Sequence, residues 1–315
     1  MLKIRPFRKG LDEEVWVRIF NAVFADYDDI RCITVEEMKK LEDSPSFDEG
    51  GMFIAEWSGR PVSTVDAYVD RQRTDGKGFI QSLGVLPEYR RRGIAKRLVE
   101  KALQSLIHRG MKTVDTWAQT DKEGCVHVYE SLGFKQARFT SMMKRTLKNS
   151  LPVPQGNMEV EIREVQVKDD EDIELLNRLD NESFKEHNDF RLRTLEETKY
   201  WIFEMPWFNK QAWFFAVLHD QPVGHVGIAI DEGLNEEKNL KWGWILDIGV
   251  LKPHRRSGIG TRLMLHSMEL LKTMGMEEAL LYVDEMNPTE AIKLYEKLGF
   301  KLARRNIVYR LAFAE

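Results

Sequence analysis

The chain has 315 residues, of which 43% are hydrophobic and 31% are charged, and its formal net charge at pH 7 is −4. This length is enough for two domains of ordinary size, and the composition is typical of a soluble globular protein. It excludes a membrane-spanning protein, since no apolar run approaches roughly 18 residues, and a disulfide scaffold, since Cys32 and Cys125 are the only cysteines. The N-terminus MLKIRPFRKG lacks the apolar core of a signal peptide, so we expect a cytoplasmic protein.

Charge is divided unevenly along the chain. Residues 1–155 contain 26 Lys and Arg against 22 Asp and Glu, whereas residues 156–315 contain 21 against 29. Neither part is basic enough to predict nucleic acid as the main partner. No cluster of residues has the spacing of metal ligands, so we expect no metal site. Because the chain has no long apolar run, we also expect no membrane partner.

The first half predicts a sheet flanked by helices. A turn near Gly59 leads into a strand, and the β-rich run GFIQSLGVL (78–86) ends just before three arginines. A helix is predicted next, because apolar residues recur at helical spacing and Gly110 stands where a C-terminal capping glycine belongs. Its apolar stripe consists of Ile94, Leu98, Val99, Ala102, Leu103, Leu106 and Ile107. The strand KTVDTWA and a helix ending in VYESLGF (128–134) complete this half.

The second half repeats this order of elements. The run WGWILDIGVL (242–251), the glycine Gly275, the strand EALLYVD and the helix end LYEKLGF (294–300) follow one another at corresponding positions. Between the halves, LKNSLPVPQGNM (147–158) has two prolines and no strong periodicity, which is typical of a linker. The sequence therefore predicts two similar α/β domains, each with a mixed sheet: residues 1–148, a linker over 149–158, and residues 159–315.

One phrase occurs in both halves. VLPEYRRRGIA (85–95) and VLKPHRRSGIG (250–260) match at six of eleven positions. A strand that passes through a short loop into a glycine-led helix leaves the first N–H groups of that helix unpaired, and these groups bind anions. The glycines let the backbone approach a ligand oxygen, and the arginines add charge-assisted contacts to phosphate. The phrase lacks the Gly-Lys-Ser/Thr of a P-loop and the third glycine of a dinucleotide fingerprint, so it predicts another kind of phosphate or pyrophosphate site.

This phrase, followed later by YExLGF, resembles the GNAT superfamily of acetyl-CoA-dependent N-acetyltransferases, and each half does so along most of its length. In that family the loop binds the coenzyme A pyrophosphate, while the preceding strand end splays from its neighbour, pairs with pantetheine and supplies a backbone N–H to the thioester carbonyl. The resemblance implies acetyl-CoA as cofactor. It assigns coenzyme A binding to Leu83, Gly84, Val85, Arg90, Arg91, Arg92, Gly93, Ile94 and Ala95, and to Ile248, Gly249, Val250, Arg255, Arg256, Ser257, Gly258, Ile259, Gly260 and Asn287.

The tyrosine of YExLGF, here Tyr129 and Tyr295, is the family's usual general acid for the departing thiolate. A hydroxyl with an ordinary pKa of about 10 can protonate a thiolate of pKa roughly 8.5. The alternative is that each tyrosine is a core residue of an amphipathic helix. We expect the second half to carry the chemistry, because Asn287 stands where the first half has Asp121, which cannot donate a hydrogen bond when ionised. The first half would mainly bind coenzyme A or support the fold.

The second half most resembles the mycothiol synthases, which are tandem GNAT proteins. The stretches SFKEHNDF (183–190), MPWFNKQAWFFAV (205–217) and LLYVDEMNPTEAIKLYEKLGF (280–300) carry this resemblance. It implies that Asp189 and Tyr282 lie around the substrate. Trp244 stands where that family has a glutamate used as base and substrate contact, and Ala229 stands where it has a lysine. Trp244 is therefore expected beside the acceptor, and both departures argue against the cysteinyl-glucosamine-inositol substrate.

These departures leave the general base open. The candidates near the site are Asp247, Asp284, Glu285, His187 and Asp189. We choose Asp247, although it could equally form a structural cap or pair, and a bulge in its strand would change the face to which it points. The tryptophans Trp201, Trp207, Trp213, Trp242 and Trp244 are interpreted as core and interface residues rather than a binding cage.

The sequence thus predicts an N-acetyltransferase that moves an acetyl group directly from acetyl-CoA to a primary amine, with Tyr295, Asp247 and Tyr129 as catalytic residues. The acceptor is either a small-molecule amine or a protein N-terminus or lysine. The alternative is a non-catalytic sensor or scaffold in which one or both halves bind acyl-CoA.

Overall fold

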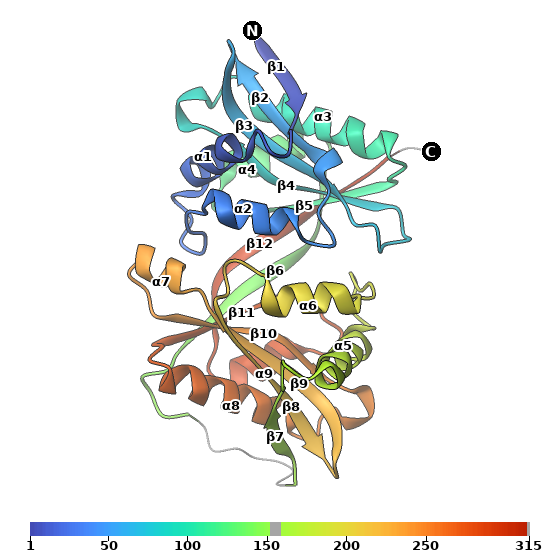
Figure 1. Ribbon diagram of the computed structural model, residues 1–315, viewed down its shortest axis with the longest axis vertical. Helices are drawn as coiled ribbons and strands as arrows, with labels where there is room; N and C mark the ends of the chain where they lie inside the picture. The colour runs from blue at the N-terminus through green and yellow to red at the C-terminus, as the bar shows by residue number, and fades with distance from the viewer. Residues whose placement is uncertain (152–158, 314–315) are drawn as a thin grey trace. The chain divides into compact units, whose positions relative to one another are not determined.

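The computed structural model describes residues 1–151 and 159–313. The chain divides into two compact units, which we describe separately (Figure 1). Unit 1 comprises Met1–Phe139 and Asn306–Glu315, and unit 2 comprises Thr140–Arg305.

Unit 1 is built on a mixed sheet in the order β1-β2-β3-β4-β5-β12. All neighbouring strands are antiparallel except β4 and β5, which are parallel. Its strands are β1 (Leu2–Pro6), β2 (Met52–Trp57), β3 (Arg60–Val69), β4 (Lys77–Val85), β5 (Thr113–Gln119) and the end of β12 (Lys301–Ala312). Its helices are α1 (Glu13–Phe24), α2 (Val35–Glu42), α3 (Ile94–His108) and α4 (Glu123–Ser131).

Unit 2 repeats this plan in the order β7-β8-β9-β10-β11-β6, and β10 and β11 form its parallel pair. Its strands are β7 (Glu161–Glu164), β8 (Lys210–Leu218), β9 (Gln221–Ile230), β10 (Trp242–Val250), β11 (Glu278–Asp284) and the end of β6 (Lys135–Thr146). Its helices are α5 (Asp170–Phe184), α6 (Leu195–Phe203), α7 (Glu232–Glu237), α8 (Ile259–Thr273) and α9 (Ala291–Lys297). The prediction of two helix-flanked mixed sheets is confirmed.

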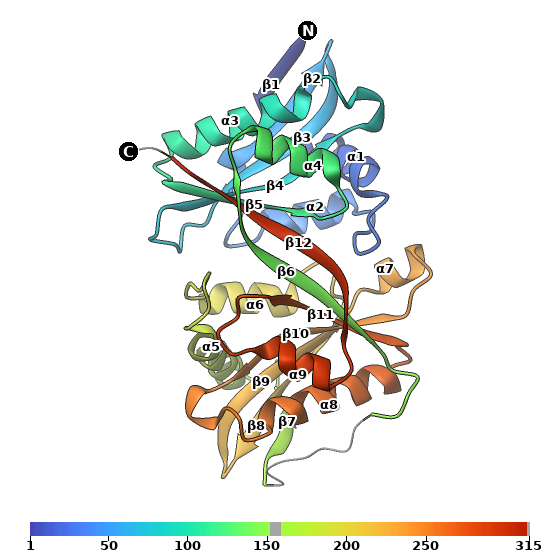
Figure 2. The same cartoon turned by 180° about the vertical axis from the view of Figure 1, so that it is seen from behind.

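The last strand of each sequence repeat belongs to the other unit. Residues 140–146 of β6 pair with β11 in unit 2, and residues 306–312 of β12 pair with β5 in unit 1 (Figure 2). The compact units therefore differ from the division at 149–158 that the sequence repeat suggests, because a repeat describes chain order and hydrogen bonding decides where a strand lies. Residues 152–158 of the expected linker lie outside the described residues.

The helices form where their apolar stripes and end signals predict. Helix α3 buries most of its stripe against the sheet, and Leu103 is partly buried there. Ile107 is 51% exposed, so its predicted place on the buried face is wrong. Gly110 and Gly275 follow α3 and α8 with φ of 81° and 85°, a conformation that glycine adopts without strain. Helices α2 and α6 both begin with a capping box, in which a threonine and a glutamate satisfy the free backbone N–H groups.

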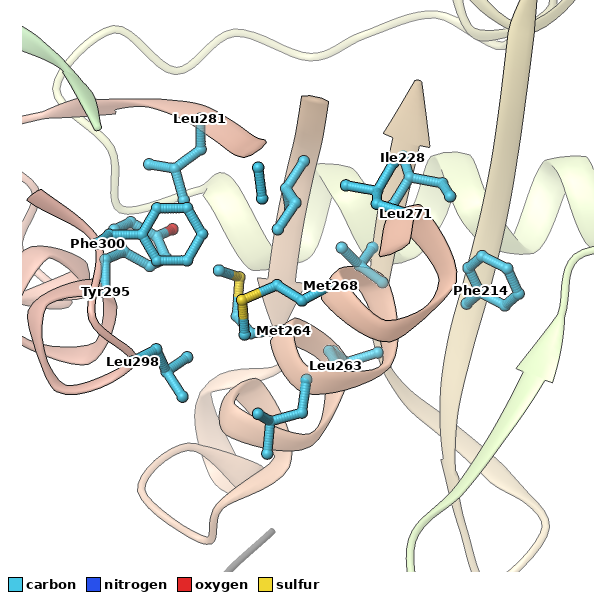
Figure 3. Close-up of a cluster of buried hydrophobic side chains, with 14 of the residues drawn as sticks. Phe214, Ile228, Leu263, Met264, Met268, Leu271, Leu281, Tyr295, Leu298 and Phe300 are labelled. Atoms are coloured by element: carbon cyan, nitrogen blue, oxygen red, sulfur yellow. The ribbon is translucent and has the colours of Figure 1, made fainter. Parts of the chain in front are cut away.

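In unit 2, helices cover both faces of the sheet. The main core lies between the sheet and α8, where Met264 and Met268 lie on the side of β11 and α9 and Leu271 lies on the side of Ile228 of β9 (Figure 3). On the opposite face, Leu176 and Leu179 of α5 pack against Trp213 and Phe215 of β8, while Phe214 between them points to the α8 side. This alternation along β8 is the expected pattern of a strand covered on both faces.

Candidate active site

Each sheet opens at its parallel strand pair. In unit 2, the pairing of β10 with β11 ends at Trp244 and Leu280, although both strands continue. In unit 1, the pairing of β4 with β5 ends at Ile80 and Thr116. The residues beyond this point keep backbone N–H and C=O groups that β11 or β5 does not bond, and such groups can pair with an extended ligand.

A bulge in β10 decides which side chains face which side of the opening. Leu246 and Asp247 lie opposite the single residue Gly227, because the register shifts between Ile245 and Ile248. Leu246 and Asp247 both contact the α5 side, where Leu246 packs in the apolar cluster and Asp247 pairs with Arg193. Ile248 packs on the α8 side. Unit 1 also has a bulge, one position later in the repeat, with Ser82 and Leu83 opposite Val65.

The repeated loop has the same conformation in both units. Gly93 and Gly258 are the N-cap residues of α3 and α8, with φ of 76° and 89°, and neither helix has a side-chain cap. Arg91 and Arg256, two residues earlier, both have φ of 63°. The first-turn N–H groups of both helices therefore have no capping side chain, which suits an anion at the positive end of the helix dipole.

The arginines of the loop differ in what they contact. The Nε atoms of Arg90 and Arg255 donate to the carbonyl oxygens of Val85 and Val250, at 3.1 and 3.0 Å, so these two side chains hold the loop against the end of the strand. Arg255 is also bonded to Glu186 and to the carbonyl oxygen of Ser183. These hydrogen bonds hold the guanidinium groups of Arg90 and Arg255 against the protein.

The remaining loop side chains have separate positions. Arg92 lies over the rings of Trp57 and Tyr89, and Arg256 is exposed beside Glu290 at 3.2 Å. The hydroxyl of Ser257 donates to the carbonyl oxygen of His254 at 2.6 Å. Arg91 and Arg256 are both exposed to solvent, from which phosphate would approach.

Both candidate tyrosines are buried in the cores beneath the loop helices. Tyr129 packs against Phe134 and Tyr309, and burial raises the pKa of its hydroxyl well above the ordinary value. Burial also raises the pKa of Tyr295, which packs with Phe300 beside α8 (Figure 3). Tyr129 additionally interacts with the side chains of Thr116 and Cys125. The two tyrosines thus have similar burial but different polar surroundings.

Asp247 belongs to a polar cluster on the α5 side of unit 2. Arg193 Nη1 lies 2.9 Å from Asp247 Oδ2 and 3.3 Å from Asp180 Oδ2, so one guanidinium is shared by two carboxylates. Behind them, Nε2 of the fully buried His225 lies 3.8 Å from Asp180 Oδ1. Burial, followed by the charge of Asp247, raises the pKa of Asp180 to about 7, and burial lowers the pKa of His225 to about 4.

Trp244, Ala229 and Tyr282 come together at the point where β10 and β11 part. Trp244 pairs in register with Ala229 of β9, and its ring stacks on that of Tyr282 at 5.8 Å with an interplanar angle of 10°. Trp244 is 7% exposed and Tyr282 is 44% exposed, so the tyrosine presents the outer surface of this pair. Arg304 Nη2 donates to the Tyr282 hydroxyl at 2.8 Å.

The other candidates lie around the same strand end. Asp189 lies in the α5–α6 loop, and its neighbour Asn188 donates to the carbonyl oxygen of Met286, just after β11. Asp284 accepts from the backbone N–H of Met286 at 2.8 Å. Oδ1 of Asn287 accepts from Thr289, which fixes the amide group in the turn before α9.

Two further base candidates have different surroundings. Glu285 is held by Arg305 at 2.6 Å and by Ser141, which is typical of a structural carboxylate. His187 is partly buried, and burial lowers its pKa. Among the tryptophans, the core assignment is confirmed for Trp213 and Trp242, which are 3% and 5% exposed.

Sequence reasoning missed Asp180, Arg193 and His225. Asp180 occupies a buried position of α5, seven residues after Ile173, so its place on the apolar face of the helix was a detectable signal. No local pattern connects Arg193 or His225 to Asp247, because they come from different elements.

The comparisons with known proteins agree with this geometry. The sequence model of the acetyltransferase (GNAT) family matches residues 16–134 and 175–300, one region in each half and together more than half of the chain. The chain belongs to the acetyltransferase (GNAT) family. The two matched regions make it a tandem member, as predicted.

Two relatives of the chain are mycothiol acetyltransferases, the narrower group that its second half resembles. The chain is similar to a mycothiol acetyltransferase of Thermobispora bispora, with 31% identity over 147 residues that cover 46% of this chain and 50% of that protein. It is also similar to a mycothiol acetyltransferase of Thermobifida fusca, with 28% identity over 243 residues that cover 72% of each. The match thus spans only half the length of the first of these relatives.

A solved structure supports the tandem GNAT fold. A tandem GNAT protein from the clavulanic acid biosynthesis pathway aligns over 100% of this chain and 99% of its own, with a TM-score of 0.75 and 16% identity. Within residues 1–151 and 159–313, no helix is both long and apolar enough to cross a membrane. In the same part of the chain, no group of three His, Cys, Asp or Glu residues could hold a metal ion.

Proposed function

We propose that this protein is an N-acetyltransferase that moves an acetyl group directly from acetyl-CoA to a primary amine, and that unit 2 carries the reaction. The observation that supports this most is the opening between β10 and β11. At this opening the chain places a glycine-capped helix, an unpaired strand end and a carboxylate, Asp247, that is partly exposed. These are the groups that an anionic thioester donor and an amine acceptor require.

The residues of the opening have separate roles in the proposed acetyl transfer. Acetyl-CoA supplies the acetyl group as a thioester. The N–H groups of α8 and its loop bind the pyrophosphate, and backbone N–H groups at the end of β10 donate to the oxygen that gains charge during transfer. Asp247 takes the proton of the amine, and Tyr295 gives a proton to the leaving thiolate. Since burial raises the pKa of Tyr295, its hydroxyl keeps that proton until the thiolate forms.

The choice of unit 2 rests on the matching positions of unit 1. The offset between the repeated loops, Val85 against Val250, gives unit 1 Ser82 at the position of Asp247, and a serine is not a base at neutral pH. In unit 1 the amide of Asn287 is replaced by Asp121. We therefore assign coenzyme A binding and support of the fold to unit 1.

The acceptor side is more apolar than the resemblance to mycothiol synthases implies. Trp244 and Ala229 face each other across β9 and β10, and both stand where that family has charged residues. A small amine with an apolar or aromatic group fits a wall formed by Trp244 and Tyr282 better than a sugar does. Asp189 supplies a nearby carboxylate for a cationic acceptor.

The test is thiol release by the purified chain with acetyl-CoA and a panel of primary amines that includes aromatic amines, polyamines and a lysine peptide. Release that depends on one class of amine, with the acetylated product found by mass spectrometry, supports the proposal. Acetyl-CoA binding by calorimetry without thiol release across the panel would overturn it in favour of an acyl-CoA sensor or scaffold.

A further inference from the structure

The two repeats can be aligned by their hydrogen bonds in the region around Asp247. In unit 1, Asn21 Oδ1 accepts from the backbone N–H of Ile33 at 2.9 Å, and in unit 2, Asn181 Oδ1 accepts from the backbone N–H of Arg193 at 2.8 Å. The capping boxes of α2 and α6 follow directly in both. Arg193 therefore occupies the position of Ile33.

The same comparison fixes three further positions. Asp180 precedes Asn181 as Phe20 precedes Asn21. The offset between the repeated loops, Val85 against Val250, places Ser82 at the position of Asp247, and Leu83 and Ile248, the next residues, both pack in the main cores. His225 pairs with Gly249 as Thr64 pairs with Gly84, so His225 replaces a threonine. At each of these four positions unit 2 has an ionisable residue, and unit 1 has an apolar or hydroxyl residue: Asp180, Arg193, His225 and Asp247 against Phe20, Ile33, Thr64 and Ser82.

Placing ionisable residues at these buried positions lowers the stability of the folded unit. His225 is fully buried, Asp180 is 7% exposed, and neither His225 nitrogen nor Asp180 Oδ1 has a hydrogen-bond partner within the described structure. Burying charges costs several kcal/mol per ion, and apolar replacements of a buried ion cluster are often neutral or stabilising. Unit 1 forms the same fold with an apolar residue at two of the positions. The cluster is therefore dispensable for folding, and such departures concentrate at functional sites.

We propose that Arg193 and Asp180 are positioning residues for the base of unit 2: Arg193 fixes the carboxylate of Asp247 at the strand opening, and Asp180 supplies the counter-charge of Arg193 when Asp247 takes the proton of the amine. This inference rests on the proposed function.

The movement of protons during the reaction explains why the carboxylates of Asp247 and Asp180 share the guanidinium group of Arg193. An acceptor that arrives as an ammonium ion gives one proton to Asp247, and its nitrogen then forms the C–N bond as the C–S bond breaks. The thiolate takes a proton from Tyr295, and the second proton that the nitrogen loses on becoming an amide restores the tyrosine. Once Asp247 is neutral, Arg193 would lack a counter-ion in a half-buried site. Asp180 at 3.3 Å prevents this, so the proton transfer leaves no unpaired charge.

The cluster of Asp180, Arg193 and Asp247 predicts how turnover depends on pH. The charged or titratable groups around Asp247 are Arg193 and His187 from the α5–α6 loop, Asp180 from α5 and His225 from β9. With a pKa of about 7, Asp180 is neutral below this pH and cannot balance Arg193 when Asp247 is protonated. Asp247 is then a poorer base. Turnover with saturating substrates should therefore rise as the pH increases through about 7.

The experiment compares the full-length chain with four variants. Arg193→Ile should lower kcat by about 10²-fold, as expected for a misplaced reacting group, with the acetyl-CoA KM unchanged. Asp180→Asn should remove the rise near pH 7. The double variant Asp180→Phe with Arg193→Ile copies unit 1, so it should keep its thermal unfolding temperature and lose turnover. Arg191→Met is the matched control: Arg191 pairs with Glu197 at 2.6 Å as Arg31 pairs with Glu37, and its loss should lower stability and leave kcat unchanged.

The outcomes separate this inference from the proposed function. If the wild-type chain acetylates an amine and Arg193→Ile keeps both its kcat and its pH profile, the inference is overturned. If the wild-type chain acetylates no amine of the panel, the proposed function fails. The inference is then decided by the titration of Asp180, followed by NMR of carboxyl-¹³C aspartate and assigned through Asp180→Asn. Asp247→Asn should lower the titration midpoint of Asp180, and an unchanged midpoint overturns the coupling.

Discussion

At the scale of single residues, we expect the loop glycines to be required for the binding of acetyl-CoA. Gly258 has φ of 89° at the start of α8, which is a conformation that a β-branched residue adopts only with strain. We expect Gly258→Val to remove one acetyl-CoA site, because its side chain would stand where the pyrophosphate lies. Titration calorimetry on the whole chain measures the stoichiometry, which we expect to be two, or one if unit 1 does not bind.

Gly275→Val is the control for this change. Gly275 has a similar φ of 85° at the other end of α8, and the Cβ atom that it would gain meets open space, with nothing within 4 Å. It should therefore cause comparable strain and leave acetyl-CoA binding unchanged. Unaltered stoichiometry in a folded Gly258→Val chain would falsify the assignment of the loop.

Substitution of Tyr295 and of Tyr129 tests which unit carries the reaction. Tyr295→Phe should lower kcat by about 10²–10⁴-fold, the usual contribution of a general acid, and should leave the acetyl-CoA KM nearly unchanged. Tyr129→Phe should leave turnover nearly intact, since Tyr129 is assigned to the core of unit 1. Steady-state kinetics with the accepted amine measures both. A larger loss in Tyr129→Phe would reverse the roles of the units.

At the scale of elements, β12 completes the sheet of unit 1 through a buried ion pair. Arg310 donates twice to Asp115 of β5, at 2.6 Å each, and Asp115 is 1% exposed. Lys77 and Arg138 lie farther away, both at 3.8 Å. Among the side chains that contact Asp115, Arg310 therefore makes the closest link between the exchanged strand and β5, in addition to the backbone pairing of residues 306–312.

Arg310→Met should lower the free energy of unfolding by about 1.5–3 kcal/mol, the usual contribution of hydrogen bonds to a charged group. Urea unfolding measures this change. The control is Lys199→Met, which removes an exposed pair with Asp170 at 2.6 Å and should cost about 0–1 kcal/mol. Equal losses in the two variants would contradict an anchoring role for Arg310.

At the scale of the whole molecule, two units of one fold have diverged in their acceptor sides. Both have an aromatic pair where the strands part, Phe79 with Trp117 in unit 1 and Trp244 with Tyr282 in unit 2. Only unit 2 combines this pair with the Asp180, Arg193 and Asp247 cluster.

We expect negligible turnover of the mycothiol precursor by the purified chain, because Trp244 and Ala229 remove two charged groups from the acceptor side. Mass spectrometry of the product, beside an amine from the panel that is accepted, measures this. Efficient acetylation of the precursor would show that these two departures were given too much weight.

The sequence by itself determined the repeat, the fold class and the conformation of the loop before each long helix. These features depend on local chemistry: a strand end, left-handed glycines at 93 and 258, and helices with one apolar stripe. The similarity of the two halves made each motif visible twice. The helix over residues 94–108 was predicted nearly to its ends, and only the exposure of Ile107 was misjudged.

Only the tertiary structure decided which strand completes which sheet, which way Asp247 points and what surrounds it. The exchange of β6 and β12 depends on hydrogen bonds between segments far apart in the chain. The direction of Asp247 depends on a one-residue bulge in β10, and a shift of one residue moves a side chain to the other face of a strand. Asp180, Arg193 and His225 meet there from three elements, because packing brings together side chains that share no local pattern.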